Sequence, residues 1–189
     1  MPNSQRIVIR VKKGRDGRTA LSCTRADGST TWQRQEGAQA TFFPKHDLTH
    51  CAVEMTLGHR EGFYGLVSAG WNFSDFGSPW PRGRLPVEAS ISEMIVGLFD
   101  LERRIGERVS ADEANRRLAE YCVENGLPPG RQLTEEDLAR VRAKRAELFE
   151  KWDAVPPGDA LEIPFELEPA EASGRASGAS QHRRNAKAR

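Results

Sequence analysis

The sequence predicts an α+β fold in which a small antiparallel sheet packs against three to four helices. Three observations lead to this prediction. Residues 1–35 alternate apolar and polar side chains between turn signals, which is typical of a β-meander. Residues 44–155 hold apolar positions at helical spacing between capping residues. Residues 160–167 return to alternation and offer one more strand.

The predicted meander has three short strands joined by two turns. In RIVIRVKK, at 6–13, apolar residues occupy every second position, and the turn residues GRDG follow. RTALSCTRAD, at 18–27, leads through a second turn at Gly28 to TTWQRQ at 30–35. The late segment ALEIPFEL alternates in the same way, and Pro164 within it suits an edge strand or a bulge. We therefore expect a sheet of three strands, which this segment can join at an edge.

The first predicted helix runs from Pro44 to Leu57. Proline is favoured in a first helical turn because its missing N–H would find no partner there, and Thr41 is a candidate cap just upstream. Gly58 offers the left-handed conformation that ends many helices. Residues 58–86 are rich in glycine and aromatic residues, which favours an ordered loop with a short helix in FYGLVSAGW.

Three later helices are indicated by caps and by apolar periodicity. One starts near Pro86 and carries apolar residues at helical spacing as far as Ile105. A second follows Ser110, which forms a capping-box pattern with Glu113. A third follows a Thr134 cap and has acidic residues in its first turn. Together with the first helix, these make up the helical part of the fold.

By composition the chain divides into a single domain at 1–168 and a tail at 169–189 that we expect to be disordered. The tail has five Arg or Lys residues against one acid, Glu171, and no apolar periodicity. Such a basic tail could contact nucleic acid non-specifically. No stretch of the chain approaches the roughly 20 apolar residues that span a bilayer, and its start lacks a secretory signal pattern. We therefore expect a cytoplasmic protein without membrane contact, whose partners the composition does not identify.

The stretch PKHDLTHCAVE carries the strongest functional pattern in the chain. An α-helix turns about 100° per residue, so its four ionisable side chains share one arc of roughly 100°; they are His46, Asp47, His50 and Glu54. Apolar residues cover most of the remaining circumference, which predicts a buried helix. Buried ionisable groups need partners or a function, so this arc is the place to look for a site.

Two imidazoles one helical turn apart can reach the same ion, and a carboxylate is the natural third donor. We therefore predict a site for zinc or another divalent metal, with His46, His50 and Glu54 as its ligands. Glu54 is the nearest carboxylate, although a linear i, i+4, i+8 set strains tetrahedral closure. The other candidates for the third ligand are His59, Glu88 and Glu102.

The sequence HDLTH, at 46–50, resembles the HExxH helix of zinc metallopeptidases, with aspartate in place of glutamate. The resemblance implies that His46 and His50 ligate zinc and that Asp47 is the catalytic general base on the attacking water. Aspartate is one methylene shorter than glutamate, so it would hold that water differently. The activity implied is hydrolysis, if the site is catalytic.

A longer segment, FPKHDLTHCAVEMTLGHREGFYGLVSAGW, is similar to a pattern in uncharacterised small bacterial proteins. Its parts are a proline, HDLxHxxVE, a Leu-Gly break and a Gly/aromatic segment that ends in an Ala-Gly turn. The similarity implies a bacterial, soluble domain built around this helix, and it implies no activity. Among the aromatic residues, we expect that Phe63, Trp71 and Phe73 include some that wall one side of the site.

The alternative hypothesis is a non-enzymatic binding or interaction domain in which the same His, Asp and Glu groups form a buried polar network. The two hypotheses differ in geometry. In a metal site, nitrogens of His46 and His50 converge on one open point beside a third donor. In a network, each nitrogen is instead occupied by a carbonyl or a carboxylate.

Overall fold

The computed structural model describes residues 5–167, and the sheet is built from the two ends of that range. The predicted meander is present as β1 (Gln5–Lys13), β2 (Thr19–Arg25) and β3 (Thr30–Gln35). The late segment forms β4 (Ala160–Leu167), which pairs with β1, so the order is β3-β2-β1-β4 with every pair antiparallel. The α+β prediction is thus confirmed, whereas the predicted tail lies outside the described residues.

Side-chain alternation gives the sheet one buried face. On β1, Ile7, Ile9 and Val11 are buried, while the residues between them are partly or largely exposed. Pro164 lies opposite Val8 in the register, on the edge strand β4, where a residue without an N–H is tolerated. The position predicted for this proline is therefore confirmed.

The histidine helix, α1, spans Gly37–Leu57 and therefore starts earlier than the predicted Pro44. Pro44 lies inside the helix, where it cannot donate the usual hydrogen bond to the carbonyl four residues earlier, and it is buried there. The predicted end is confirmed: Gly58 adopts φ 74° and its N–H donates to the Glu54 carbonyl.

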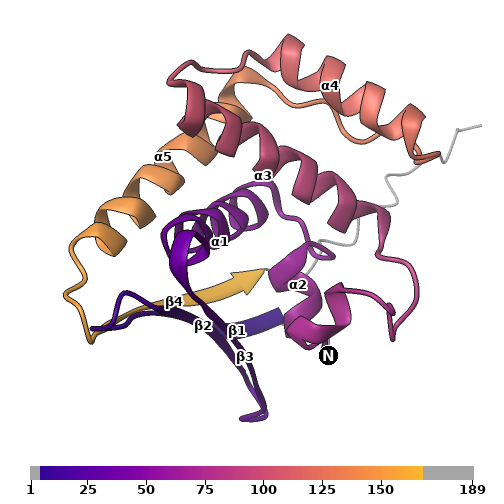
Figure 1. The fold of residues 1–189 in the computed structure, drawn as a ribbon. Helices are drawn as coiled ribbons and strands as arrows, with labels where there is room; N and C mark the ends of the chain where they lie inside the picture. The colour runs from indigo at the N-terminus through magenta and orange to yellow at the C-terminus, as the bar shows by residue number, and fades with distance from the viewer. Residues whose placement is uncertain (1–4, 168–189) are drawn as a thin grey trace, which may run out of the picture.

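The helices form layers on the buried face of the sheet (Figure 1). α1 lies between the sheet and a pair formed by α3 (Val87–Ile105) and α5 (Glu135–Asp153). α4 (Ala111–Glu124) packs on the outer side of α3. Because α1 has neighbours on both sides, its residues from Asp47 to Glu54 are all buried, as its apolar circumference predicted.

The predicted caps of the later helices and the short helix of the glycine-rich segment are also found, whereas Thr41, the candidate cap of the first helix, lies inside α1, whose N-cap is Glu36. Ser110 accepts a hydrogen bond from the Glu113 N–H at the start of α4, and Thr134 forms a capping box with Asp137 at the start of α5. The glycine-rich segment holds α2 (Phe63–Ser68) and a 3₁₀ helix, η1 (Phe73–Phe76). Within residues 5–167, no helix has the combination of length and apolar composition that a membrane span requires.

Candidate metal centre

α1 presents two histidines, one turn apart, toward α3. The rings of His46 and His50 lie 4.9 Å apart, centroid to centroid, and both are largely withdrawn from solvent. The i, i+4 spacing predicted this shared face. The chemistry open to the two imidazoles depends on the side chains of α3 that they contact.

Glu93 of α3 faces both imidazoles. One of its oxygens, Oε2, lies 3.0 Å from His50 Nε2, and the other, Oε1, lies 3.9 Å from His46 Nε2. One ligand atom from each of the three residues lies within 4.8 Å of the other two. His46, His50 and Glu93 therefore form a group that could hold a metal ion.

The distances between the ligand atoms of this group are close to those around a zinc ion, so a small movement of the side chains would let them bind one. A tetrahedral zinc ion with bonds of 2.0–2.1 Å holds its ligand atoms about 3.3 Å apart. The observed distances, 3.0 Å from His50 Nε2 to one Glu93 oxygen and 3.9 Å from His46 Nε2 to the other, lie on either side of that value. The Glu93 side chain is 61% exposed, so its carboxylate can rotate without disturbing the core.

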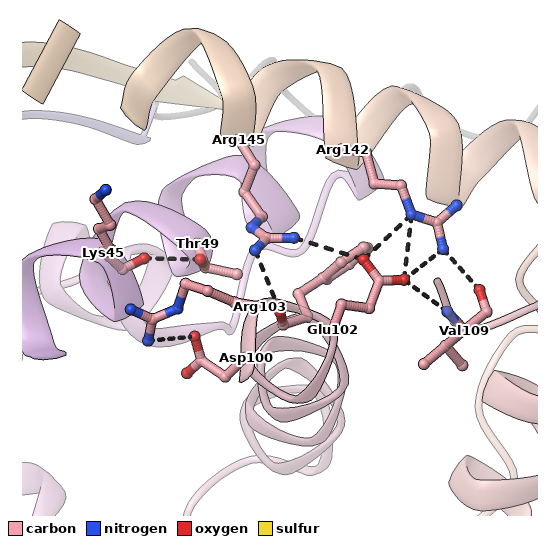
Figure 2. Close-up of polar contacts among 9 residues, drawn as sticks. Lys45, Thr49, Asp100, Glu102, Arg103, Val109, Arg142 and Arg145 are labelled. Carbon is pink, nitrogen blue, oxygen red and sulfur yellow. Dashed lines mark hydrogen bonds and ion pairs between the residues drawn. The ribbon is translucent and has the colours of Figure 1, made fainter. Parts of the chain in front are cut away.

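The remaining nitrogen of His46 is held by Asp100. Its Nδ1 lies 2.7 Å from Asp100 Oδ2. Arg103 donates to the other oxygen of the same carboxylate at 3.1 Å, as Figure 2 shows. Burial would raise the pKa of Asp100, but the hydrogen bond to His46 and the charge of Arg103 outweigh it and lower that pKa. An ionised Asp100 favours a proton on Nδ1, which leaves Nε2 free to ligate.

Glu54, predicted as the third ligand, lies outside the group of His46, His50 and Glu93. Its carboxylate is fully buried: Oε2 accepts a hydrogen bond from the Gly65 N–H at 3.0 Å, and Oε1 lies 3.4 Å from His50 Nδ1. Neither atom of the latter pair has another hydrogen-bond partner among residues 5–167. Eight residues of helix rise about 12 Å, which is too far for Glu54 and His46 to share one ion. Glu54 is therefore placed to orient His50.

Two glycines make room for the Glu54 carboxylate. A Cβ on Gly62 would lie 2.5 Å from Glu54 Cδ, and a Cβ on Gly65 would lie 2.1 Å from the Arg60 carbonyl oxygen. Any larger residue at Gly62 would displace the carboxylate, and one at Gly65 would displace the backbone that donates to it. Part of the glycine pattern in this segment is thus explained by one buried side chain.

Asp47 lines a cavity of about 330 Å³ that also contains the side chains of His46, His50 and Glu93. It is 5% exposed, and it forms no hydrogen bond or ion pair with any other side chain in the described range. Burial raises the pKa of the Asp47 carboxyl to about 7, although the nearby histidines lower it. A buried carboxyl without a hydrogen bond, next to the group of His46, His50 and Glu93, is unusual for a purely structural residue.

Aromatic side chains form the apolar walls of this cavity. Phe43, Phe63 and Phe76 line it, and the Phe63 ring lies 5.5 Å from the His50 ring. Phe73 stacks behind Phe63 at 5.4 Å, and Trp71 contacts Phe76 at 5.3 Å. The prediction that this segment walls the site is confirmed by Phe63, while Phe73 and Trp71 support the wall from behind.

The other predicted ligands are engaged elsewhere. His59 Nδ1 is 2.6 Å from the Ser92 hydroxyl, and Glu88 accepts the Glu61 N–H. Glu102 pairs with Arg142 between α3 and α5, as Figure 2 shows. None of the three joins the His46, His50 and Glu93 group.

His50 also satisfies part of the alternative hypothesis, because each of its nitrogens has a carboxylate nearby. Burial would lower the pKa of His50, but hydrogen bonds and charges from Glu54 and Glu93 outweigh it and raise that pKa to about 10. Without a metal ion, a protonated His50 between two carboxylates is therefore a stable arrangement.

Comparisons with models of protein families, with curated proteins and with solved structures found no match for this chain. The similarity to small bacterial proteins and to the HExxH helix thus remains a prediction from the motif.

Proposed function

We propose that the chain binds one divalent metal ion through His46, His50 and Glu93 and that the site is hydrolytic. One observation supports this most strongly: the two Nε2 atoms and the Glu93 carboxylate face one another, while Asp100 and Glu54 lie against the two Nδ1 atoms. A carboxylate behind each imidazole is the usual companion of a metal-ligating histidine.

Zinc is the ion that we expect first. Two imidazoles and one carboxylate make up the protein ligands of many catalytic zinc sites, which keep a further position open. The same ligand set also suits non-haem Fe(II). Elemental analysis of the purified protein would identify which metal is bound.

The proposed chemistry is hydrolysis of a carbonyl compound in the cavity beside the group. The bound ion would supply Lewis-acid activation. Asp47 would accept the proton of the attacking water, since it is buried, unpartnered and on the cavity wall. His46 and His50 would be fixed in orientation by Asp100 and Glu54, so that the site is organised before substrate arrives.

The rival function is an interaction domain in which the grouped side chains form a charge network without metal. The observation that favours it is the position of His50 between Glu54 and Glu93, which stabilises its protonated form. In that case the histidines and acids would contribute to stability alone, and neither a chelator nor added zinc would change the protein.

Elemental analysis of protein purified without a histidine tag distinguishes the two functions. We expect about one equivalent of metal in the wild type, and its loss in His50→Ala, because one of three ligands is removed. Asp47→Asn should keep the metal and lose turnover of ester and anilide substrates, because it keeps the shape but removes the base. Wild-type protein that contains no metal and takes up none from added zinc would refute the proposal.

A further inference from the structure

The cavity beside the candidate metal centre contains no lysine or arginine in its lining, so far as residues 5–167 are concerned. Its charged groups are the carboxylates of Asp47 and Glu93 and the two histidines of the group. Its other polar side chains are neutral: Gln33, Ser90 and Tyr121. The cavity therefore offers hydrogen bonds, and its protonated His50 already lies between the carboxylates of Glu54 and Glu93.

This charge pattern disfavours anionic ligands. Proteins recognise phosphate, sulfate and carboxylate groups chiefly with Arg and Lys side chains. A divalent ion at the site would have its two positive charges balanced by Asp47 and Glu93, so it would leave no surplus for an anion. An anion buried beside the Asp47 carboxylate would therefore repel it and would have no cation left to pair with.

The apolar walls of the cavity favour a ligand that contains a ring. Phe43, Phe63 and Phe76 present aromatic surface, and Leu85 and Ala89 complete the apolar lining. Phe63 is held rigidly, with Phe76 at 4.7 Å on one side and Phe73 stacked at 5.4 Å. At about 330 Å³ the cavity is at the small end of the roughly 300–1,000 Å³ typical of ligand pockets. It therefore has room for a compound with one ring.

We infer that the site takes a small uncharged compound that carries one ring and an amide or ester carbonyl, and that it rejects ring compounds bearing phosphate, sulfate or carboxylate. The carbonyl part of this inference rests on the proposed hydrolytic function. The preference for an uncharged ring rests on the cavity alone and holds with or without a metal ion.

The test compares two probes of almost the same shape, benzamide and benzoate. Their dissociation constants are measured by calorimetry on the full chain, once loaded with zinc and once treated with EDTA. We expect benzamide to bind at least about tenfold more tightly than benzoate in both forms, because like charges placed together in an interface are strongly unfavourable. Asp47→Asn should shrink that ratio by improving benzoate binding, whereas Asp112→Asn, an exposed acid on α4, should leave it unchanged.

Each outcome has a defined meaning. Benzoate binding as tightly as benzamide in either form would overturn the inference, and so would the absence of benzamide binding at about 10 mM. A preference for benzamide in a protein that takes up no zinc would support the uncharged-ring preference and refute the metal function. Zinc uptake and ester hydrolysis together with a preference for benzoate would support the metal function and refute the inference.

Discussion

The Glu54 carboxylate on α1 has two partners on different elements. One of its oxygens, Oε2, accepts a hydrogen bond from the N–H of Gly65 in α2, and the other, Oε1, lies against His50 Nδ1. Its full burial means that water cannot replace either partner. Its expected contribution is to fix which nitrogen of His50 carries the proton.

Replacing Glu54 by Gln tests this orienting role. The amide keeps the shape but loses the charge that favours a proton on His50 Nδ1, so we expect zinc affinity to fall by about 10–100-fold. The measurement is a competition titration against a fluorescent zinc chelator. Glu136→Gln, an exposed acid on α5, serves as the matched control and should bind zinc as the wild type does. Unchanged affinity in the Glu54 variant would show that this carboxylate is structural only.

His59 should make folding stability depend on pH. Burial lowers the pKa of His59 below its ordinary value of about 6.5; Glu88 and Glu54 oppose the shift, and Arg131 adds to it. Because the unfolded chain then takes up this proton at a higher pH than the folded chain, stability is fully present above about pH 6.5 and is lost as the pH falls toward the lowered pKa.

His59→Asn should remove that part of the pH dependence, since Asn can still hydrogen-bond to Ser92 but does not titrate. We expect the free energy of unfolding, measured in urea at about pH 8 and about pH 5.5, to fall less in the variant than in the wild type. Equal losses in the two proteins would contradict a lowered pKa for His59.

The residues of the site differ in how far sequence could predict them. His46, Asp47 and His50 share a local pattern, and the helical period placed them on one face. Glu93 comes from another helix, so no local spacing connects it to the histidines. One signal was present: Glu93 and Asp100 are seven residues apart on α3, which puts both carboxylates on the same helical face. The apolar periodicity of α3 shows where its core face lies but does not show which helix its acids will meet.

At the scale of elements, α3 connects the site to the rest of the helical layer. Glu93 and Asp100 face α1, while Glu102, two residues after Asp100 and so about 200° round the helix, faces α5. Figure 2 shows Arg142 and Arg145 reaching from α5 to Glu102, and the Val109 N–H also donates to it at 2.9 Å. The position of the two carboxylates at the site thus depends on how α3 is held by α5.

Glu102→Ala should be strongly destabilising. It would leave Arg142 and Arg145 largely buried without their carboxylate, and breaking a buried ion pair in this way costs about 3–5 kcal/mol. The free energy of unfolding in urea measures the loss. Glu120→Ala removes an exposed pair with Arg116 and should have little effect on the free energy of unfolding. Similar losses in the two variants would show that the α3–α5 network contributes little.

The elements themselves were predicted well where caps or turns mark them. Ser110 and Thr134 begin α4 and α5 as expected, because a side chain that satisfies free backbone N–H groups acts locally. The start of α1 was missed because Pro44 is typical of a first turn, yet here it lies inside a helix that is buried between two layers. Tertiary burial outweighed the local preference at that point.

At the scale of the whole molecule, the candidate site lies at the contact between two layers. α1 is enclosed by the sheet on one side and by α3 and α5 on the other (Figure 1). A metal ion bound by His46, His50 and Glu93 would join α1 to α3, so its binding free energy would add to the stability of the whole fold. The charge network of the rival hypothesis would join the same helices without any dependence on metal.

The melting temperature of the wild-type protein in EDTA and in zinc tests the central claim most directly. With free zinc at about 100 times its dissociation constant, binding adds about 2.7 kcal/mol, which for a chain of this size raises the melting temperature by about 5–10 °C. We predict that rise in zinc and its reversal by EDTA. Identical melting temperatures in the two solutions would contradict the metal site. They would favour the rival hypothesis, in which the ionisable groups of α1 form a charge network without metal.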